Sequence, residues 1–173
     1  MTEVLAKRVT LAAMDAVDIN AIRQQVKWLN DPEVVRFSEQ RHKFHTVESQ
    51  VNYLTTMRSP NIYRTINLDG KIIGSVSAVV DEPNQVANLG ILIGEKEHWG
   101  KRHGLDAWIQ MVDYLFLHRN IRIVEAGCMA NNYAMINIFR HSGMLCDGHR
   151  VGHFLFSGQP MSMEMWSIHR PTQ

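Results

Sequence analysis

An apolar strand-like run, a glycine-rich basic turn and an amphipathic helix follow one another in this chain, and this succession constrains its fold most. The run GILIG (90–94) leads into EKEHWGKRHG (95–104), and from Gly100 the apolar spacing changes from two to about 3.6. The helix face comprises Leu105, Trp108, Ile109, Val112, Leu115 and Phe116. Because another strand-like run follows at 121–129, we predict a strand–helix–strand crossover with parallel strands and right-handed connection.

A second strong signal precedes this unit. The runs 62–68 and 71–80 are rich in β-forming residues and are separated by Asp69-Gly70, which is typical of a tight hairpin. A turn at 81–84 then leads to the strand 86–94. We therefore predict an antiparallel meander of these runs before the crossover.

The remaining elements have weaker signals. We expect a short strand at 8–12, a helix to Leu29 capped by Asp15 or Asp18, a helix opened by Thr46, a helix from Asn131-Asn132 to Ser142-Gly143, and a closing hairpin of 152–158 with 161–168. We also expect Met161, Met163 and Met165, which alternate along the last strand, to pack in the core.

Length and composition favour one globular domain spanning 1–173. The chain has 173 residues, of which 45% are hydrophobic and 20% charged, and its formal net charge is +1. This charge argues against a nucleic-acid or membrane-coating protein. With no apolar run of about 18 residues and no signal-peptide pattern, we expect a cytoplasmic protein.

Neither cysteine nor histidine spacing indicates a metal site. Cys128 and Cys146 lack CxxC spacing and lie in apolar runs, so we expect two buried free thiols. The nine histidines are scattered and no HExxH occurs. We therefore predict no metal.

The turn before the central helix has the composition of an anion site. The first amides of a helix lack intrahelical partners and carry the positive end of the dipole. Gly100 and Gly104 allow close backbone approach, while Lys101 and Arg102 add charge that opposes the dipole unless an anion compensates it. The P-loop and GxGxxG patterns are absent. The alternative is an ordinary solvated helix start.

Three segments resemble the GNAT (Gcn5-related N-acetyltransferase) superfamily. LGILIGEKEHWGKRHGLDAW (89–108) is similar to its acyl-coenzyme A segment, NYAMINIFRHSGM (132–144) to its second conserved helix, and 28–49 to its substrate-side segment. The closest branch contains ribosomal-protein N-terminal and nucleotide-amino-sugar acetyltransferases. The resemblance implies a three-layer α+β fold with a mixed, mostly antiparallel central sheet of about six to seven strands and a splayed cofactor slot.

The resemblance also implies acetyl-CoA as acyl donor and names its binding residues. The pantetheine arm would pair with the backbone of Ile91, Leu92 and Ile93, and Asn132 would lie near the thioester. The pyrophosphate would lie on Trp99, Gly100, Lys101, Arg102, His103, Gly104 and Leu105.

Three positions depart from the family pattern. Arg102 replaces a usual glycine, Phe139 occupies the position of a tyrosine that protonates the thiolate at the cofactor, and Asn88 replaces a frequent glutamate base. Asn88 is a candidate to position a water, or else an exposed strand residue. His153 and Glu164 are candidates for a displaced base, although exposed strand positions are the simpler interpretation.

For the acceptor, the resemblance puts Arg41 and His42 beside the substrate, where they would bind a phosphate or carboxylate, unless the loop is merely solvated. We predict direct transfer to a small primary amine, such as a nucleotide-linked amino sugar. The alternatives are a protein N-terminus as acceptor and a catalytically silent CoA-binding module. A homodimer is possible.

Overall fold

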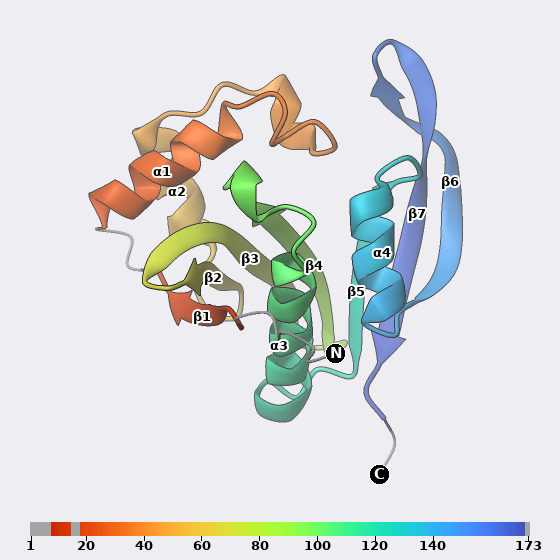
Figure 1. The fold of residues 1–173 in the computed structure, drawn as a ribbon. Coiled ribbons are helices and arrows are strands. Elements are labelled where there is room, and N and C mark those ends of the chain that lie inside the picture. The colour runs from red at the N-terminus through yellow and green to blue at the C-terminus, as the bar shows by residue number, and fades with distance from the viewer. Residues whose placement is uncertain (1–7, 15–17, 172–173) are drawn as a thin grey trace, which may run out of the picture.

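The computed structural model describes residues 8–14 and 18–171. Its elements, in chain order, are β1 (Thr10–Ala13), α1 (Ile19–Leu29), the 3-10 helix η1 (Glu39–His42), α2 (Val47–Thr56), β2 (Ile62–Leu68), β3 (Lys71–Asp81), β4 (Val86–Ile93), the 3-10 helix η2 (Lys96–His98), α3 (His103–His118), β5 (Ile123–Met129), α4 (Tyr133–His141), β6 (Leu145–Phe156) and β7 (Gln159–His169). Figure 1 shows their arrangement.

One sheet of seven strands organises these elements, in the order β1-β2-β3-β4-β5-β7-β6. Only β4 and β5 pair in parallel, through the crossover helix α3, and every other neighbouring pair is antiparallel. The predicted α+β class, the mostly antiparallel sheet and the parallel crossover are therefore confirmed.

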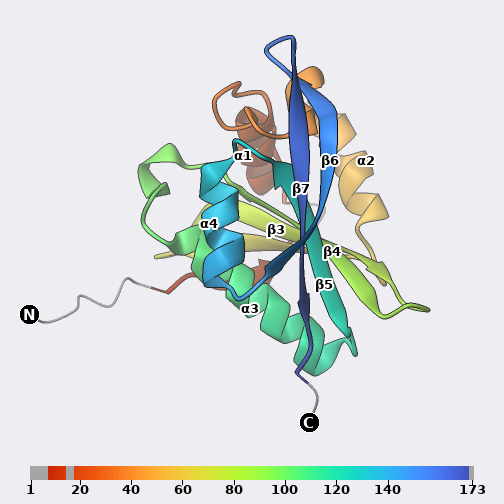
Figure 2. The same cartoon turned by 90° about the vertical axis from the view of Figure 1, so that its right-hand side faces the viewer.

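Helices cover both faces of the sheet, which gives three layers (Figure 2). The amphipathic helix α3 and the helix α4 cover one face, where Trp108, Leu115, Val76, Val124 and other buried residues form the core. On the other face, α1 and α2 pack across β2 and β3. A buried polar contact joins these layers, because Gln50 Nε2 and Tyr63 Oη both donate to Gln25 Oε1, at 2.7 and 2.9 Å.

The pairing of β4 with β5 is short, and this creates a slot in the sheet. The register joins only Val86 to Ile123, Ala87 to Val124 and Asn88 to Glu125. Beyond Asn88 the two strands separate, as Figure 1 shows. The backbone of β4 on the side of β5 is therefore left without a strand partner, as the splayed slot of the prediction requires.

Several predicted boundaries need correction. The central helix begins at His103 rather than near Gly100, because Gly100 (φ 71°) and Arg102 (φ 66°) adopt left-handed backbone angles that no α-helix contains. The strand predicted from 121 begins at Ile123. Asp18 caps α1, and Thr46 with Ser49 forms a capping box at α2. Asp15 lies outside the described residues.

The last hairpin differs more from the prediction. β6 begins at Leu145 instead of 152, because register shifts after Cys146 and after Arg150 interrupt its alternation. Cys146 is exposed, so the prediction of a buried thiol is correct only for Cys128. The alternating methionines Met161, Met163 and Met165 are only half-buried and lie outside the core cluster, so their core assignment is wrong.

Among the described residues, no helix has both the length and the apolar character needed to cross a membrane.

Candidate functional site

A cavity of about 690 Å³ occupies the slot at the open end of β4. Its walls come from the loop between α1 and α2, the end of β4, the η2–α3 turn and the face of α4. Ten residues predicted for the cofactor line it: Ile91, Leu92, Ile93, Trp99, Gly100, Arg102, His103, Gly104, Leu105 and Asn132. Its volume falls within the range of small-ligand sites.

The start of α3 supplies unpartnered amides to this cavity. The first intrahelical bond runs from the Asp106 amide to the Arg102 carbonyl at 3.0 Å, and no side chain caps the helix. His103, Gly104 and Leu105 therefore present amides without intrahelical partners at the positive end of the α3 dipole. A Cβ at Gly104 would lie 3.2 Å from Ile138 Cδ1, so the glycine also lets α3 approach α4 closely. This geometry suits an anion.

The two basic residues of the turn differ in their position relative to the cavity. Arg102 lines the cavity, whereas Lys101 is exposed and does not contribute to the wall. Trp99 also lines it, and its Nε1 donates to the Ile93 carbonyl at 2.8 Å. That bond fixes the indole and occupies the Ile93 carbonyl. Because backbone groups alternate in direction along a strand, Leu92 pairs with Ser75 of β3, and Ile91 retains the free backbone groups on the open side of β4.

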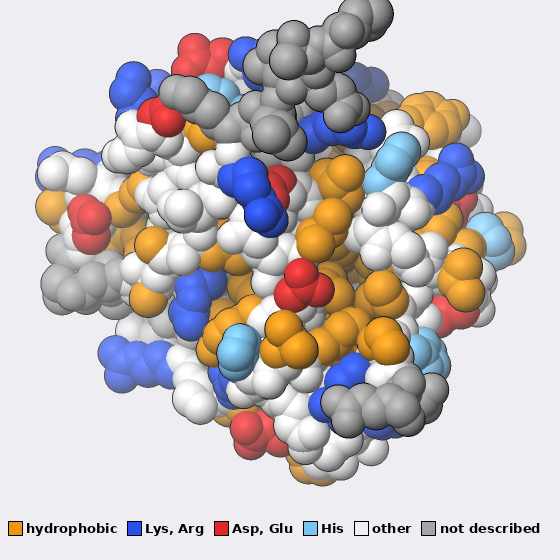
Figure 3. All heavy atoms as spheres, turned by 60° about the horizontal axis from the view of Figure 1, so that its bottom comes forward, with side chains coloured by type: hydrophobic (Ala, Val, Ile, Leu, Met, Phe, Trp, Pro, Cys, Tyr) orange, Lys and Arg blue, Asp and Glu red, His pale blue; other side chains and the backbone are white. Residues whose placement is uncertain are grey.

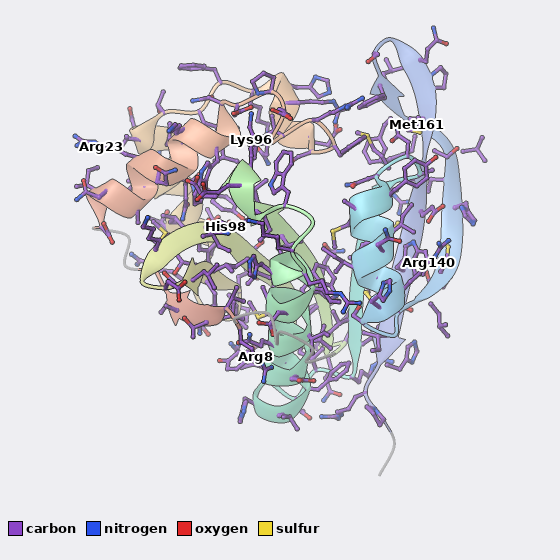
Figure 4. The ribbon with its side chains drawn as sticks, viewed as in Figure 1. Arg8, Arg23, Lys96, His98, Arg140 and Met161 are labelled. Atoms are coloured by element: carbon purple, nitrogen blue, oxygen red, sulfur yellow. The ribbon has the colours of Figure 1, made fainter. Side chains whose placement is uncertain are left out.

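Two imidazoles meet beside the helix start. His98 and His103 both line the cavity, with ring centroids 5.5 Å apart in an edge-to-face arrangement. Burial, and secondarily the neighbouring His98, lowers the pKa of His103. Figure 4 shows His98 at the turn between β4 and α3. His98 lies in a polar turn and has no periodic signal in the sequence.

Asn132 and Phe139, both on α4, differ in exposure. Asn132 lines the cavity and caps α4, accepting from the Met135 amide at 3.2 Å through Oδ1. Its Nδ2 has no hydrogen-bond partner among the described residues and remains available to a ligand. Phe139 is fully buried between Trp108 and Trp166 and does not line the cavity, so its ring packs in the core rather than at the predicted cofactor position.

The loop between α1 and α2 reaches the tip of the β6–β7 hairpin. Arg41 Nη1 binds Glu39 Oε1 at 2.6 Å, and its Nη2 donates to the Leu155 carbonyl at 3.1 Å. Arg41 is therefore a structural clamp and, like the exposed His42, does not line the cavity. The predicted substrate role has no support in this geometry.

A different arginine of this loop lines the cavity. The Phe37 and Phe156 rings stack at 5.5 Å with an interplanar angle of 9°, and the Arg36 guanidinium lies 5.2 and 5.6 Å from their centroids. Arg36 is exposed and has no carboxylate within ion-pair distance among the described residues. The only signal for it in the sequence is its position within the substrate-side segment 28–49.

The one carboxylate among the cavity-lining residues lies in an ion pair. Glu33 pairs with Lys96, whose Nζ also lies 2.9 Å from Asp31 Oδ2. The Glu33 carboxylate in turn raises the pKa of Lys96, which keeps the ammonium charged. Lys96 lies just beyond β4, next to the α1–α2 loop, as Figure 4 shows. The one carboxylate of the cavity wall is thus held in an ion pair whose ammonium it shares with Asp31.

Asn88 lies outside this cavity, at the closed end of the slot. It is exposed, and its Nδ2 lies 3.4 Å from Glu125 Oε1 on the paired strand. The other predicted base candidates point elsewhere. Glu164 accepts from Trp166 Nε1 at 3.0 Å, and His153 packs its ring against Phe154 at 4.8 Å. No cluster of three or more metal-ligating side chains occurs among the described residues.

Comparisons with known proteins agree with this geometry. The family model of the acetyltransferase (GNAT) domain matches residues 8–145. An uncharacterized N-acetyltransferase, p20 of Bacillus licheniformis, is 24% identical over 174 residues, covering 91% of this chain and 96% of that protein.

Solved structures share the fold at low identity. Spermidine N-acetyltransferase from Vibrio cholerae, in complex with CoA and spermine, superposes with a TM-score of 0.83 at 16% identity, covering 94% of this chain and 96% of that one. RimL, a ribosomal L7/L12 α-N-protein acetyltransferase in complex with coenzyme A, also gives 0.83, at 14% identity and 95% and 96% coverage. At such identity these likenesses establish the fold and leave the substrate open.

Proposed function

The chain belongs to the GNAT acetyltransferase family, and on that premise we propose that it transfers acetyl from acetyl-CoA to a small primary amine that carries an anionic group. A nucleotide-linked amino sugar is the leading example. The observation that carries the acceptor class is Arg36, a cavity-lining cation without a carboxylate partner among the described residues.

The cavity residues fit the acyl donor. The unpartnered amides of His103, Gly104 and Leu105 suit the pyrophosphate, and the bare β4 edge at Ile91 suits the amides of a pantetheine arm. CoA is bound in the two solved relatives described above. When bound, acetyl-CoA supplies an activated acyl group whose thiolate leaves without help from an acid, so loss of the family tyrosine at Phe139 is compatible with turnover.

Direct attack of the amine is the mechanism we favour. An acyl-enzyme route needs a nucleophilic thiolate near the donor. Cys128 is buried, and burial raises its pKa to about 12, while Cys146 lies on the outer strand β6. Neither cysteine lines the cavity, so the amine itself would form the new bond in a ternary complex.

Charge on the acceptor side argues against a polyamine. A polycation needs carboxylates that are free to bind it, but Glu33, the one carboxylate among the cavity-lining residues, is already paired with Lys96, and Arg36 and Arg102 add positive charge to the cavity wall. The protein N-terminus stays the alternative acceptor. On the face in Figure 3, basic and acidic side chains are interspersed around a band of apolar ones, a surface without the basic stripe of nucleic-acid binders.

An acceptor panel tests the proposal. Calorimetry with acetyl-CoA establishes donor binding, and thiol release then compares nucleotide-linked amino sugars, spermidine and peptides with free N-termini. We expect turnover with the anionic amines. In Arg36→Gln, the KM for the anionic amine should rise by up to about fivefold, the loss expected for an exposed ion pair, while acetyl-CoA affinity stays unchanged. Turnover of peptides or spermidine alone would reject the anionic acceptor.

Three further expectations accompany the proposal. We propose that the chain works as one domain in the cytoplasm, and that a homodimer is possible. Cell fractionation and light scattering of the purified protein test these expectations separately from the chemistry.

A further inference from the structure

The closed end of the slot is marked by two polar side chains. Asn88 and Glu125 form the last of the three β4–β5 pairs, and beyond them the strands separate. Their side chains lie on the same face, because Asn88 Nδ2 is 3.4 Å from Glu125 Oε1. A carboxylate therefore lies at the apex of the slot.

That face is the one turned away from α3 and α4. Val124, Ala126 and Cys128, the residues alternating with Glu125 along β5, are buried in the core, so Glu125 and Gly127 point to the opposite side. On β4 the same alternation buries Ala87 and Leu89 and turns Asn88 and Gly90 outward. Glu125 thus lies on the α1–α2 side of the sheet, which we call the acceptor layer because the proposed acceptor-binding residue Arg36 lies in the α1–α2 loop.

Two glycines stand next to this pair. Two positions beyond Asn88 and Glu125, on the same face, stand Gly90 and Gly127, and both are exposed. A Cβ at Gly127 would lie 2.1 Å from Met163 Cε and 3.1 Å from Met165 Sδ, so these half-buried methionines lie over the glycine. Gly127 is therefore covered by methionine side chains, whereas Gly90 leaves its own position on this face without a side chain.

The carboxylate also has no competing cation. No Lys, Arg or His of the described residues lies within ion-pair distance of Glu125, which is half-buried, and its only side-chain contact is Asn88. Glu164 and His153, the other candidate bases, are engaged elsewhere. Glu125 is thus a carboxylate with free acceptor capacity at the closed end of the slot, next to the residues that line the cavity but not among them.

We propose that Glu125 is the general base of the reaction and that Asn88 is its positioning partner. The inference rests on the proposed function and goes beyond it, since it assigns the proton acceptor. One Glu125 oxygen takes a proton from the acceptor ammonium, directly or through one water. The freed nitrogen lone pair forms the N–C bond with the acyl carbon as the C–S bond breaks. The second nitrogen proton passes to the departing thiolate, and the proton on Glu125 returns to solvent.

The primary test is Glu125→Gln, which keeps the shape and still accepts from Asn88. We expect kcat to fall by about 10²–10⁴, the range for general-base catalysis, with acetyl-CoA affinity by calorimetry unchanged. The acidic limb of the wild-type pH–kcat profile should flatten in the variant. Glu82→Gln, in the exposed β3–β4 turn, is the matched control and should change neither quantity.

A second variant moves the carboxylate across the strand pair. In Asn88→Glu/Glu125→Gln the two functional groups exchange places, and we expect at least about tenfold recovery of kcat over Glu125→Gln, together with the acidic limb. A merely structural contact would restore stability without restoring that limb. The melting temperature of each variant separates folding from chemistry.

The outcomes distinguish the two proposals. If Glu125→Gln turns over amines at nearly the wild-type rate and keeps the acidic limb, Glu125 is not the base, although the acetyltransferase stands. If its activity falls only because acetyl-CoA affinity or melting temperature falls, its role is structural and the inference is wrong. If the wild type neither binds acetyl-CoA nor acetylates any amine of the panel, the proposed function fails first, and Glu125 with it.

Discussion

Replacing Arg102 with glycine should stabilise the protein while leaving coenzyme binding nearly intact. Arg102 precedes α3 with φ 66° and ψ 2°, the left-handed region, and makes no side-chain cap. A non-glycine residue there costs roughly 1–2 kcal/mol. Glycine offsets about 0.4–1 kcal/mol of this gain, because it makes the unfolded chain more flexible and so lowers the stability of the folded state. We therefore expect Arg102→Gly to gain about 0.5–1 kcal/mol.

The small expected change in acetyl-CoA affinity follows from the exposure of the Arg102 side chain. Arg102 is exposed at the cavity edge, so its attraction to a phosphate is screened and worth about 1 kcal/mol or less. The backbone amides of the turn remain in Arg102→Gly. Acetyl-CoA affinity should therefore fall by no more than about fivefold, and the loss should shrink at high salt.

Arg102→Ala is the matched control, because it removes the guanidinium but keeps a Cβ at positive φ. Urea denaturation of the three proteins measures the backbone effect as the difference between glycine and alanine, and calorimetry measures the charge effect as the difference between arginine and alanine. A melting temperature about 1–4 °C higher for Arg102→Gly corresponds to the expected gain. Destabilisation by glycine would refute the account of the backbone. A loss of acetyl-CoA affinity well beyond tenfold would refute the account of the charge and show that the arginine itself binds the phosphate.

Three further predictions concern buried groups. An aromatic disulfide reagent at pH 8 should label Cys146 rapidly but Cys128 only after denaturation, because burial raises the pKa of the Cys128 thiol to about 12; two fast thiols would contradict this. Burial lowers the pKa of His103 below its usual 6.5, so the stability that neutral His103 contributes above that pH should be lost as the pH falls toward the lowered pKa. His103→Gln should therefore show a smaller drop in melting temperature between pH 8 and pH 5.5 than the wild type. Gly74→Ala should cost about 1–3 kcal/mol in urea, because its Cβ would lie 2.2 Å from the Leu92 carbonyl oxygen, whereas Gly90→Ala has ordinary contacts and should cost less.

Local chemistry made much of the fold predictable. Asp69-Gly70 specifies the β2–β3 hairpin through its positive φ angles, 50° and 79°, and Thr46 with Ser49 closes a capping box. Each of these signals acts within a few residues. The change of apolar period after Gly100 likewise identified α3 because the helix buries one face.

Features that depend on distant contacts were not predictable in this way. Arg41 resembles a substrate ligand in sequence, yet the Leu155 carbonyl, 114 positions away, engages it. The same hairpin tip provides Phe156, which stacks on Phe37 and holds Arg36 at the cavity. Neither contact has a periodic signature, so the choice between two nearby arginines required the tertiary structure.

Side chains alternate between the two faces of the sheet along β4, so this strand contributes to both halves of the site. Ile91 and Ile93 pack toward the α3 side, next to the anion-binding turn, while Asn88 and Gly90 face the acceptor layer. A shift of one residue in the β3–β4 register would exchange these faces. Gly74 opposes such a shift, since its missing side chain lets β3 approach the Leu92 carbonyl, where any Cβ would collide. The register therefore keeps the donor side of β4 and the Asn88–Glu125 pair on opposite faces of the sheet, at the point where β4 and β5 cease to pair.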